Sequence, residues 1–296
     1  MLTYNTAFYE LKNNLKRLYD EREAAAIAHE VMEHVTGLDK MKRLIEKDAT
    51  LTELQQQQYT GALTKLQTGM PLQYVLGHAW FMGRQFRVDG NVLIPRPETE
   101  ELVQWIADDH RNKNLAILDI GTGSGCIPVS LKLELPESIV TTCDISEEAI
   151  EVARKNARLL GADLEFLRGD FLSHVFRRQL PHYDVIVSNP PYIPIAEKES
   201  LDKNVRDFEP ELALFVPDED ALLFYRHIAR FGKEHLNPGG TIYCELHLDY
   251  ANATGELFRR EGYADVSVEK DMHGNLRMLK AKMSKAPQKR GLSLSS

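Results

Sequence analysis

Residues 189–192 have the sequence Asn-Pro-Pro-Tyr, which could hold a planar amide or amino group. They follow Tyr183–Ser188, a short, apolar and β-branched run typical of a buried parallel strand. Pro190 and Pro191 cannot continue a sheet, because neither donates an N–H. The segment therefore predicts a stiff loop at the carboxyl end of a strand, where ligands bind in open α/β sheets.

Two acceptors in this loop match the two hydrogens of an –NH2 group. The side-chain oxygen of Asn189 could accept one N–H and the carbonyl of Pro190 the other, while Tyr192 stacks on the flat face. An amide held in this way can direct its nitrogen lone pair at an electrophile. We therefore expect Asn189, Pro190 and Tyr192 to be catalytic and all of residues 189–192, Pro191 included, to bind substrate. A plain proline-rich loop is the alternative, and the upstream sequence argues against it.

That upstream sequence is the segment 117–125, Ile-Leu-Asp-Ile-Gly-Thr-Gly-Ser-Gly. It combines an apolar strand, an acid near the strand's end and three alternating glycines that open a helix. Glycines let the backbone turn tightly and approach a ligand closely. We expect the whole turn to bind a cofactor, with Asn189 beside it; its residues are Gly121, Thr122, Gly123, Ser124 and Gly125.

A glycine-rich turn alone is a weak signal, and the next two strands sharpen it. The strand 139–143 ends in Asp144, about 20 residues past the glycines, where an acid can bind a ribose diol. The strand 164–167 leads to Asp170, which could accept from an adenine amino group, and Phe171, which could pack on the ring. A core position is the alternative for Phe171.

The predicted ligand is an adenosine with little or no phosphate, because the turn lacks the lysine of a P-loop. This points to S-adenosyl-L-methionine, whose methyl group is carried on a sulfonium. Attack by nitrogen along the S–CH3 axis disperses the positive charge, so the protein must mainly align the reactants. No metal is needed, and we predict no metal ligands.

The segments that position these residues alternate between strand and helix patterns. We predict a helical N-terminal domain for substrate docking over 1–73, a β-hairpin linker over 74–91, a methyltransferase domain over 92–283 and a disordered basic tail over 284–296. Within the third region we expect a helix from Pro97 to about His110, a turn at 237–240, and an antiparallel edge formed by 264–268 and 276–281.

Composition restricts the partners of the chain. Its 296 residues carry a formal net charge of −8, which argues against a protein that grips nucleic acid broadly through phosphates. No apolar run approaches a membrane span and no secretory signal is apparent. We therefore expect a cytoplasmic protein without membrane or stable nucleic-acid binding. Cys126, Cys143 and Cys244 lie far apart in apolar contexts, as reduced buried thiols do.

With these residues in hand, the chain resembles the protein-(glutamine-N5) methyltransferases that modify peptide chain release factors. The resemblance runs from roughly residue 5 to residue 281. It rests on the helical N-terminal region and on motifs at 93–100 (Leu-Ile-Pro-Arg-Pro-Glu-Thr-Glu), 119–125, 144, 169–171 and 189–192. It implies an α/β fold with a seven-stranded, doubly wound, Rossmann-like sheet. It also implies that the cofactor lies on Gly121–Gly125, Asp144 and Phe171, and that Asn189–Tyr192 hold a glutamine of a class I release factor.

The sequence departs from the family pattern in three places. Phe215–Asp220 stand where a Gly-Gly pair and an Asp-Gly are usual, His247 replaces a glycine, and Pro128 is unusual near the start of its helix. None removes a group that the chemistry needs. Three alternatives stay open: methylation of an exocyclic amino group of adenine or guanine, methylation of a ribosomal-protein glutamine, and a non-catalytic adenosine-binding module.

Overall fold

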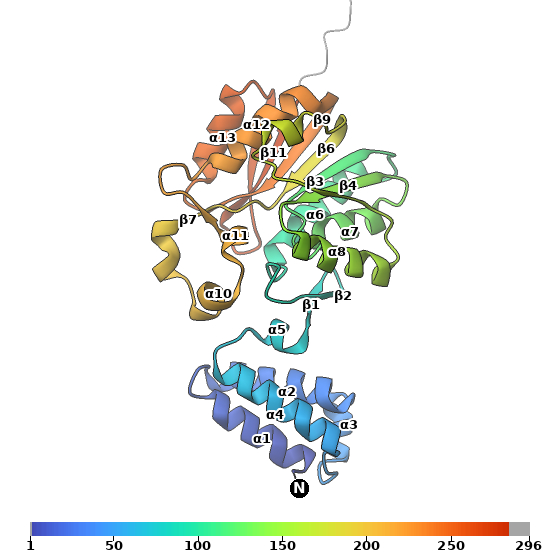
Figure 1. Cartoon of the computed structure of the whole chain (residues 1–296), viewed down its shortest axis with the longest axis vertical. Coiled ribbons are helices and arrows are strands. Elements are labelled where there is room, and N and C mark those ends of the chain that lie inside the picture. Colours follow the sequence, from blue (N-terminus) through green and yellow to red (C-terminus); the bar gives the residue numbers. More distant parts are fainter. Residues whose placement is uncertain (1, 284–296) are drawn as a thin grey trace, which may run out of the picture. The chain divides into compact units, whose positions relative to one another are not determined.

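The computed structural model describes residues 2–283 and divides into two compact units (Figure 1). The first contains the chain up to His78 together with Val88–Gly90 and Leu201–Glu209. The second contains Ala79–Arg87, Asn91–Ser200 and the chain from Pro210 onward. Leu201–Glu209 thus cluster with the N-terminal unit, although they fall inside the range 92–283. The predicted tail at 284–296 lies outside the described residues.

The first unit is helical. Its helices are α1 (Tyr4–Leu15), α2 (Glu21–Thr36), α3 (Lys40–Ile45), α4 (Glu53–Gln67), α5 (Leu72–Leu76) and α10 (Lys203–Phe208). Apolar residues at helical spacing form its core, including Leu11 and Leu15 of α1 and Val31 of α2. Thr52 caps α4, and its side chain exchanges backbone hydrogen bonds with Gln55 in a capping box.

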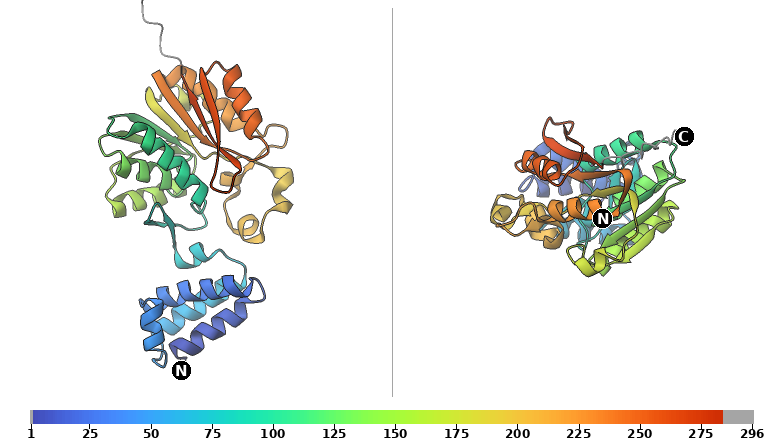
Figure 2. Two further views of the ribbon diagram at one scale, coloured as in Figure 1. Left: turned by 180° about the vertical axis from the view of Figure 1, so that it is seen from behind. Right: turned by 90° about the horizontal axis from the view of Figure 1, so that it is seen from above.

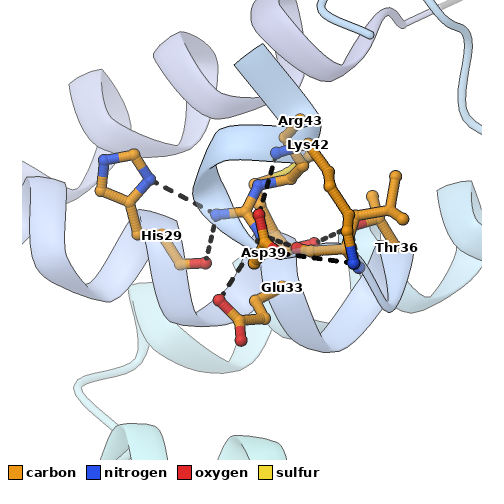
Figure 3. Close-up of polar contacts among 8 residues, drawn as sticks. His29, Glu33, Thr36, Asp39, Lys42 and Arg43 are labelled. Atoms are coloured by element: carbon orange, nitrogen blue, oxygen red, sulfur yellow. Dashed lines mark hydrogen bonds and ion pairs between the residues drawn. The ribbon is translucent and has the colours of Figure 1, made fainter. Parts of the chain in front are cut away.

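A buried arginine joins α3 to α2 in this unit (Figure 3). The Arg43 guanidinium donates to the carbonyl of His29 at 3.1 Å and to the carbonyl of Leu38, and it lies 3.8 Å from a carboxylate oxygen of Glu33. Arg43 is only 7% exposed. Burial lowers the pKa of Arg43, so the guanidinium depends on these acceptors to remain charged away from water.

The second unit is built on a seven-stranded sheet, as the resemblance implies. Its order is β10 (Asp265–Lys270), β11 (Leu276–Lys282), β9 (Leu236–Glu245), β6 (Tyr183–Ser188), β3 (Ala116–Ile120), β4 (Ile139–Asp144) and β5 (Glu165–Arg168). The five strands from β9 to β5 pair in parallel, and β11 is antiparallel to both β9 and β10. The predicted antiparallel edge is therefore confirmed.

Both faces of the sheet are covered by helices (Figure 2). Alternate residues of β3 enter opposite cores: Ile117 packs in one cluster, and Leu118 packs in the other. Helices α6 (Pro97–His110), α7 (Cys126–Glu134) and α8 (Glu147–Leu160) supply the first cluster. Helices α12 (Leu223–His235) and α13 (Ala251–Arg260) supply the second, on the side where the short α9 (His174–Arg177) also packs.

Short elements complete this unit. They are the hairpin strands β1 (His78–Phe81) and β2 (Arg84–Arg87), the parallel pair β7 (Ile193–Pro194) and β8 (Phe215–Val216), the 3-10 turn η1 (Ile195–Ser200) and α11 (Glu211–Leu214). A β-hairpin is therefore present inside the predicted range, while the bounds 74–91 and the linker role stay predictions. Asn156 of α8 anchors the hairpin, because its side chain accepts from the N–H of Arg87 at 2.7 Å and donates to the carbonyl of Arg87 at 2.9 Å.

The segment 237–240 corrects one expectation. It was expected to be a turn before the fifth strand, but β9 begins at Leu236 and includes it. The pairing with β6 shows the reason: Tyr183 faces Leu236, and Val185 already faces Thr241. The extra residues form a bulge, and Gly239 takes a positive φ of 82° within it.

Candidate active site

The predicted site residues gather where neighbouring parallel strands end. Ile120 at the end of β3 lies opposite Cys143 of β4 and Ser188 of β6. The glycine turn, Asp144 and Asn189 follow directly after these three positions, so they share one edge of the sheet. The Ser188 hydroxyl donates to the carbonyl of Ile120 at 2.8 Å and joins the two strand ends.

The glycine turn needs its glycines for two different reasons. Gly121, Gly123 and Gly125 all have positive φ, a conformation that L side chains rarely adopt. In addition, a Cβ on Gly125 would lie 3.0 Å from that of Ala153 on α8, so a side chain would press on the helix. The N–H groups of Gly121 and Thr122 both donate to the carbonyl of Cys143, which fixes the turn to β4.

Asp144 joins the glycine turn to the start of α8. Its Oδ2 accepts from the N–H of Gly123 at 3.0 Å, and its Oδ1 accepts from the N–H of Ser146 at 2.9 Å. Burial raises the pKa of Asp144, and the backbone donors oppose that rise. Each carboxylate oxygen can accept a second hydrogen bond, so the carboxylate fits a diol. Its predicted contact with a ribose stays a prediction.

Asp119, at position 4 of β3, is a buried acid that our sequence analysis did not place in the site. Its Oδ2 accepts from the Thr142 hydroxyl at 2.6 Å, while its Oδ1 has no partner among the described residues. Burial raises the pKa of Asp119 to about 7, and the neighbouring charge of Asp144 adds to the rise. Within residues 2–283, the hydroxyl oxygens of Thr122 and Ser124 are also buried without hydrogen-bond partners. These orphaned polar atoms fit a cofactor that brings donors and acceptors to this turn.

The side-chain amide of Asn189 has a hydrogen-bond partner for its nitrogen but, among the described residues, none for its oxygen. Its Nδ2 donates to the Thr99 hydroxyl at 3.3 Å, and among residues 2–283 neither its Oδ1 nor the Pro190 carbonyl accepts a hydrogen bond. The two predicted acceptors are thus available on the same short segment. Tyr192 is held by its hydroxyl, which donates to Oε1 of Glu245 at 3.1 Å.

Thr99 and Glu245 are site residues that our sequence analysis missed. Both are 2% exposed, and the Thr99 hydroxyl lies 2.5 Å from Oε2 of Glu245. Their signals were present, since Thr99 belongs to the Pro-Glu-Thr-Glu segment at 97–100 and Glu245 ends a predicted strand. On that basis, Thr99 and Glu245 could both have been predicted as polar residues of the site.

The segment that follows β5 contains the two remaining predicted site residues, Asp170 and Phe171. Asp170 is exposed, and its Oδ1 accepts from the N–H of Leu172 at 2.8 Å. Phe171 is 5% exposed and packs edge to face on Phe231 of α12, with ring centroids 5.3 Å apart. The structure therefore gives Phe171 the core position that was the alternative interpretation, and the adenine contacts of both residues stay predictions.

His247 lies beside the Asn-Pro-Pro-Tyr segment. Its Nε2 lies 3.2 Å from Oε2 of Glu197, and its Nδ1 accepts from the N–H of Asp249. Its ring meets that of Tyr192 edge to face at 5.8 Å. A glycine at this position could not pack on Tyr192, so the imidazole of His247 supplies a side-chain contact that the usual family residue lacks.

Two negative findings apply to the described part of the chain. No group of three or more His, Cys, Asp or Glu residues could hold a metal ion there. No helix within residues 2–283 has the length and apolar composition needed to cross a bilayer.

The chain is similar to known proteins over almost all of its length. The model of the PrmC N-terminal domain matches residues 7–77, and that of the methyltransferase small domain matches 98–206. The release factor glutamine methyltransferase of Bacteroides thetaiotaomicron is 44% identical over 271 residues, which are 92% of this chain and 97% of that protein. The corresponding protein of Flavobacterium psychrophilum is 40% identical over 281 residues, 94% of this chain and 97% of that protein.

A solved methyltransferase from Pyrococcus furiosus shares the fold, with a TM-score of 0.50 and 19% identity over 69% of this chain and 90% of that one. The two full-length relatives have the same name, and each is at least 40% identical to this chain over more than nine tenths of its length. The chain therefore belongs to the release factor glutamine methyltransferases and is an S-adenosyl-L-methionine-dependent enzyme.

Proposed function

We propose that this enzyme methylates the side-chain amide nitrogen, N5, of the glutamine in the Gly-Gly-Gln loop of class I release factors. The observation that carries the proposal is the state of Asn189. Its Nδ2 is bonded to Thr99, and among residues 2–283 neither its Oδ1 nor the adjacent Pro190 carbonyl accepts a hydrogen bond, so both can accept the two N–H groups of one amide. A neutral –NH2 group satisfies both acceptors, whereas a carboxylate would satisfy neither.

The residues of the chain act by alignment. Asn189 and Pro190 hold the two amide hydrogens, which draws the nitrogen lone pair out of conjugation with the amide carbonyl, and Tyr192 limits the position of the amide. S-adenosyl-L-methionine, when bound, supplies a methyl group on a positively charged sulfur. A nitrogen–carbon bond forms as the sulfur–carbon bond breaks, and the amide then loses one proton to water.

Cofactor binding falls to the neighbouring turn. Asp144 would bind the ribose, and the alternating glycines would let the backbone lie close to the cofactor. The unpartnered Oδ1 of Asp119 would accept from a donor of the amino-acid moiety. Asp170 and Phe171 stay in this proposal as residues that contact the adenine.

The substrate must present its glutamine on an extended, mobile backbone. Glycines permit backbone conformations that other residues avoid, so a Gly-Gly-Gln loop can enter a narrow site. We further propose that the helical N-terminal unit binds the body of the release factor. Translation termination takes place in the cytoplasm, which supports a cytoplasmic location. The net charge of −8 supports the absence of stable nucleic-acid binding.

The test is methyl transfer to a purified class I release factor, followed by fragment mass spectrometry. We expect one methyl group on the glutamine of the Gly-Gly-Gln loop. A release factor with glutamate at that position is the matched substrate control and should stay unlabelled, because a carboxylate places charge against two acceptors. Labelling of another residue, of a ribosomal protein in preference to the release factor, or of naked RNA or DNA would contradict the proposal.

A further inference from the structure

When Glu245 is ionised, the hydrogen bonds around Thr99 have only one consistent direction. An ionised Glu245 can only accept, so the Thr99 hydroxyl, 2.5 Å from Oε2, must donate its single proton there. Thr99 then has only lone pairs left for Asn189. The group of Asn189 that faces Thr99 at 3.3 Å is therefore its NH2, and Oδ1 is directed elsewhere.

The same carboxylate also fixes the aromatic residue of the site. Its second oxygen, Oε1, accepts from the Tyr192 hydroxyl at 3.1 Å. The backbone carbonyl of Glu245 accepts from the buried Tyr225 hydroxyl at 2.9 Å, which holds the end of β9 in place. One buried acid thus determines the orientation of an amide through Thr99 and of a phenol ring directly.

We propose that Glu245 and Thr99 are positioning residues for methyl transfer: the carboxylate fixes the polarity of Thr99, and Thr99 keeps Oδ1 of Asn189 turned toward the substrate amide. The inference rests on the proposed role of Asn189. It adds that Asn189 depends on the Glu245 carboxylate, which lies two hydrogen bonds away and need not touch the substrate. Without this direction the Asn189 amide could rotate by half a turn and present a donor to the substrate N–H.

The charge of Glu245 is set by its surroundings. Burial raises the pKa of Glu245, and the hydrogen bond from Thr99, the charge of Arg277 on β11 and the hydrogen bond from Tyr192 oppose the rise. Glu98 of α6 adds to it, and Asp271 lies 3.7 Å from the Arg277 guanidinium. A protonated Glu245 could donate to Thr99, and the fixed direction of the hydrogen bonds from Asn189 through Thr99 to Glu245 would be lost. Turnover should therefore fall as the pH drops through the pKa of Glu245.

The main test compares Thr99→Val, which keeps the shape of the side chain without its hydroxyl, with Thr99→Ser, which restores the hydroxyl. We expect Thr99→Val to lower kcat for release factor methylation by about tenfold or more, the scale of one lost directional hydrogen bond. The Kd for S-adenosyl-L-methionine should stay within about twofold, and Thr99→Ser should recover most of the loss. Thr254→Val is the matched control, since Thr254 is fully buried on α13 and its hydroxyl donates to the carbonyl of Tyr250 in its own helix.

A pH profile separates positioning from general stability. In the wild type we expect an acidic limb in kcat, and Glu245→Gln should lower kcat and flatten that limb because glutamine does not titrate. Wild-type kcat in Thr99→Val would overturn the proposal. So would equal losses in Thr99→Val and Thr99→Ser, or an acidic limb unchanged in Glu245→Gln.

A third measurement does not depend on turnover. In a ¹⁵N spectrum, the side-chain NH2 signals of Asn189, assigned by their absence in Asn189→Ala, should be protected from solvent exchange in the wild type and in Thr99→Ser. They should lose protection in Thr99→Val. An inactive wild type with this protection pattern would defeat the proposed function and leave the positioning contact standing, whereas an active wild type without it would defeat the positioning contact alone.

Discussion

Gly125 and Ala153 are in such close contact that the glycine turn and α8 pack almost backbone to backbone. A Cβ at position 125 would lie 3.0 Å from the Cβ of Ala153 and 3.1 Å from its Cα. The last residue of the turn is thus held between a positive φ of 81° and a neighbouring helix.

The first prediction compares two glycines with similar backbone. Gly125→Ala should destabilise the protein by about 2–4 kcal/mol, because it adds a steric overlap to a left-handed conformation. Gly161→Ala, at φ 72° with no atom within 4 Å, should cost only about 1–2 kcal/mol. Urea unfolding measures both, and equal costs would show that the contact with Ala153 relaxes freely.

The second prediction concerns the acceptor in the Asn-Pro-Pro-Tyr segment. Asn189→Ala should reduce methyl transfer by about 10²-fold or more, because it removes a preorganised group aimed at the reacting amide. Cofactor affinity should be almost unchanged. Asn252→Ala, at an exposed position of α13, is the control and should keep full activity. Loss of cofactor binding in Asn189→Ala would instead place Asn189 in the cofactor site.

The third prediction separates two roles of Asp144. Asp144→Ala should weaken S-adenosyl-L-methionine binding by about 1–3 kcal/mol, since the variant loses the ribose acceptor and releases the N–H groups of Gly123 and Ser146. Asp144→Asn keeps one oxygen acceptor and should lose less. Calorimetry measures the affinities, with Asp163→Ala, an exposed acid before β5, as control. Unchanged affinity in both Asp144 variants would remove Asp144 from the site.

The fourth prediction concerns Asp119 and pH. Its pKa is about 7 in the folded protein against 3.8 in the unfolded chain, so between these values the folded state binds more protons. Its contribution to the free energy of unfolding is therefore fully present below pH 3.8 and is lost as the pH rises to about 7, at up to roughly 1.4 kcal/mol per pH unit.

Asp119→Asn removes this titration and keeps a hydrogen-bond acceptor for Thr142. The stability of the variant relative to the wild type should therefore increase between pH 5 and pH 8, measured without cofactor in denaturant titrations. A difference independent of pH would mean that Asp119 does not titrate in this range.

The fifth prediction tests the buried arginine of the helical unit. Arg43→Met keeps much of the apolar stem but leaves the carbonyls of His29 and Leu38 without their donor, so it should destabilise that unit by about 1–3 kcal/mol. Arg17→Met, at an exposed position after α1, should be close to neutral. Thermal unfolding followed by circular dichroism compares the two. A stable Arg43→Met protein would show that water replaces the guanidinium.

The sequence allowed the sheet and its edge to be predicted because the signals are local. The apolar run Tyr183–Ser188 is β6 residue for residue, and Ser146 and Gly161 begin and end α8 as capping rules require. The strand order could be taken only from the resemblance, because pairing between β6 and β9 joins residues about fifty positions apart.

The polar contacts inside the site were beyond such rules. Thr99 lies 146 positions from Glu245 and 90 positions from Asn189, and no periodicity links them. The bulge at 237–240 was hidden for a related reason. Its Asn-Pro-Gly-Gly composition is typical of a turn, and it lies within β9 because the residues on either side, Leu236 and Thr241, pair with β6.

Because Asn156 is hydrogen-bonded to the hairpin, the exchange rate of one backbone amide proton can report on the stability of this contact. The amide hydrogen of Arg87 is held by Oδ1 of Asn156, whose Nδ2 also donates to the carbonyl of Ser124 at 2.8 Å. That proton can exchange with deuterium only when its hydrogen bond to Asn156 breaks. If the Asn156 side chain moves away, the glycine turn also loses the hydrogen bond at the carbonyl of Ser124. Exchange at Arg87 therefore reports how firmly the turn is held, and a cofactor that orders the turn should slow it.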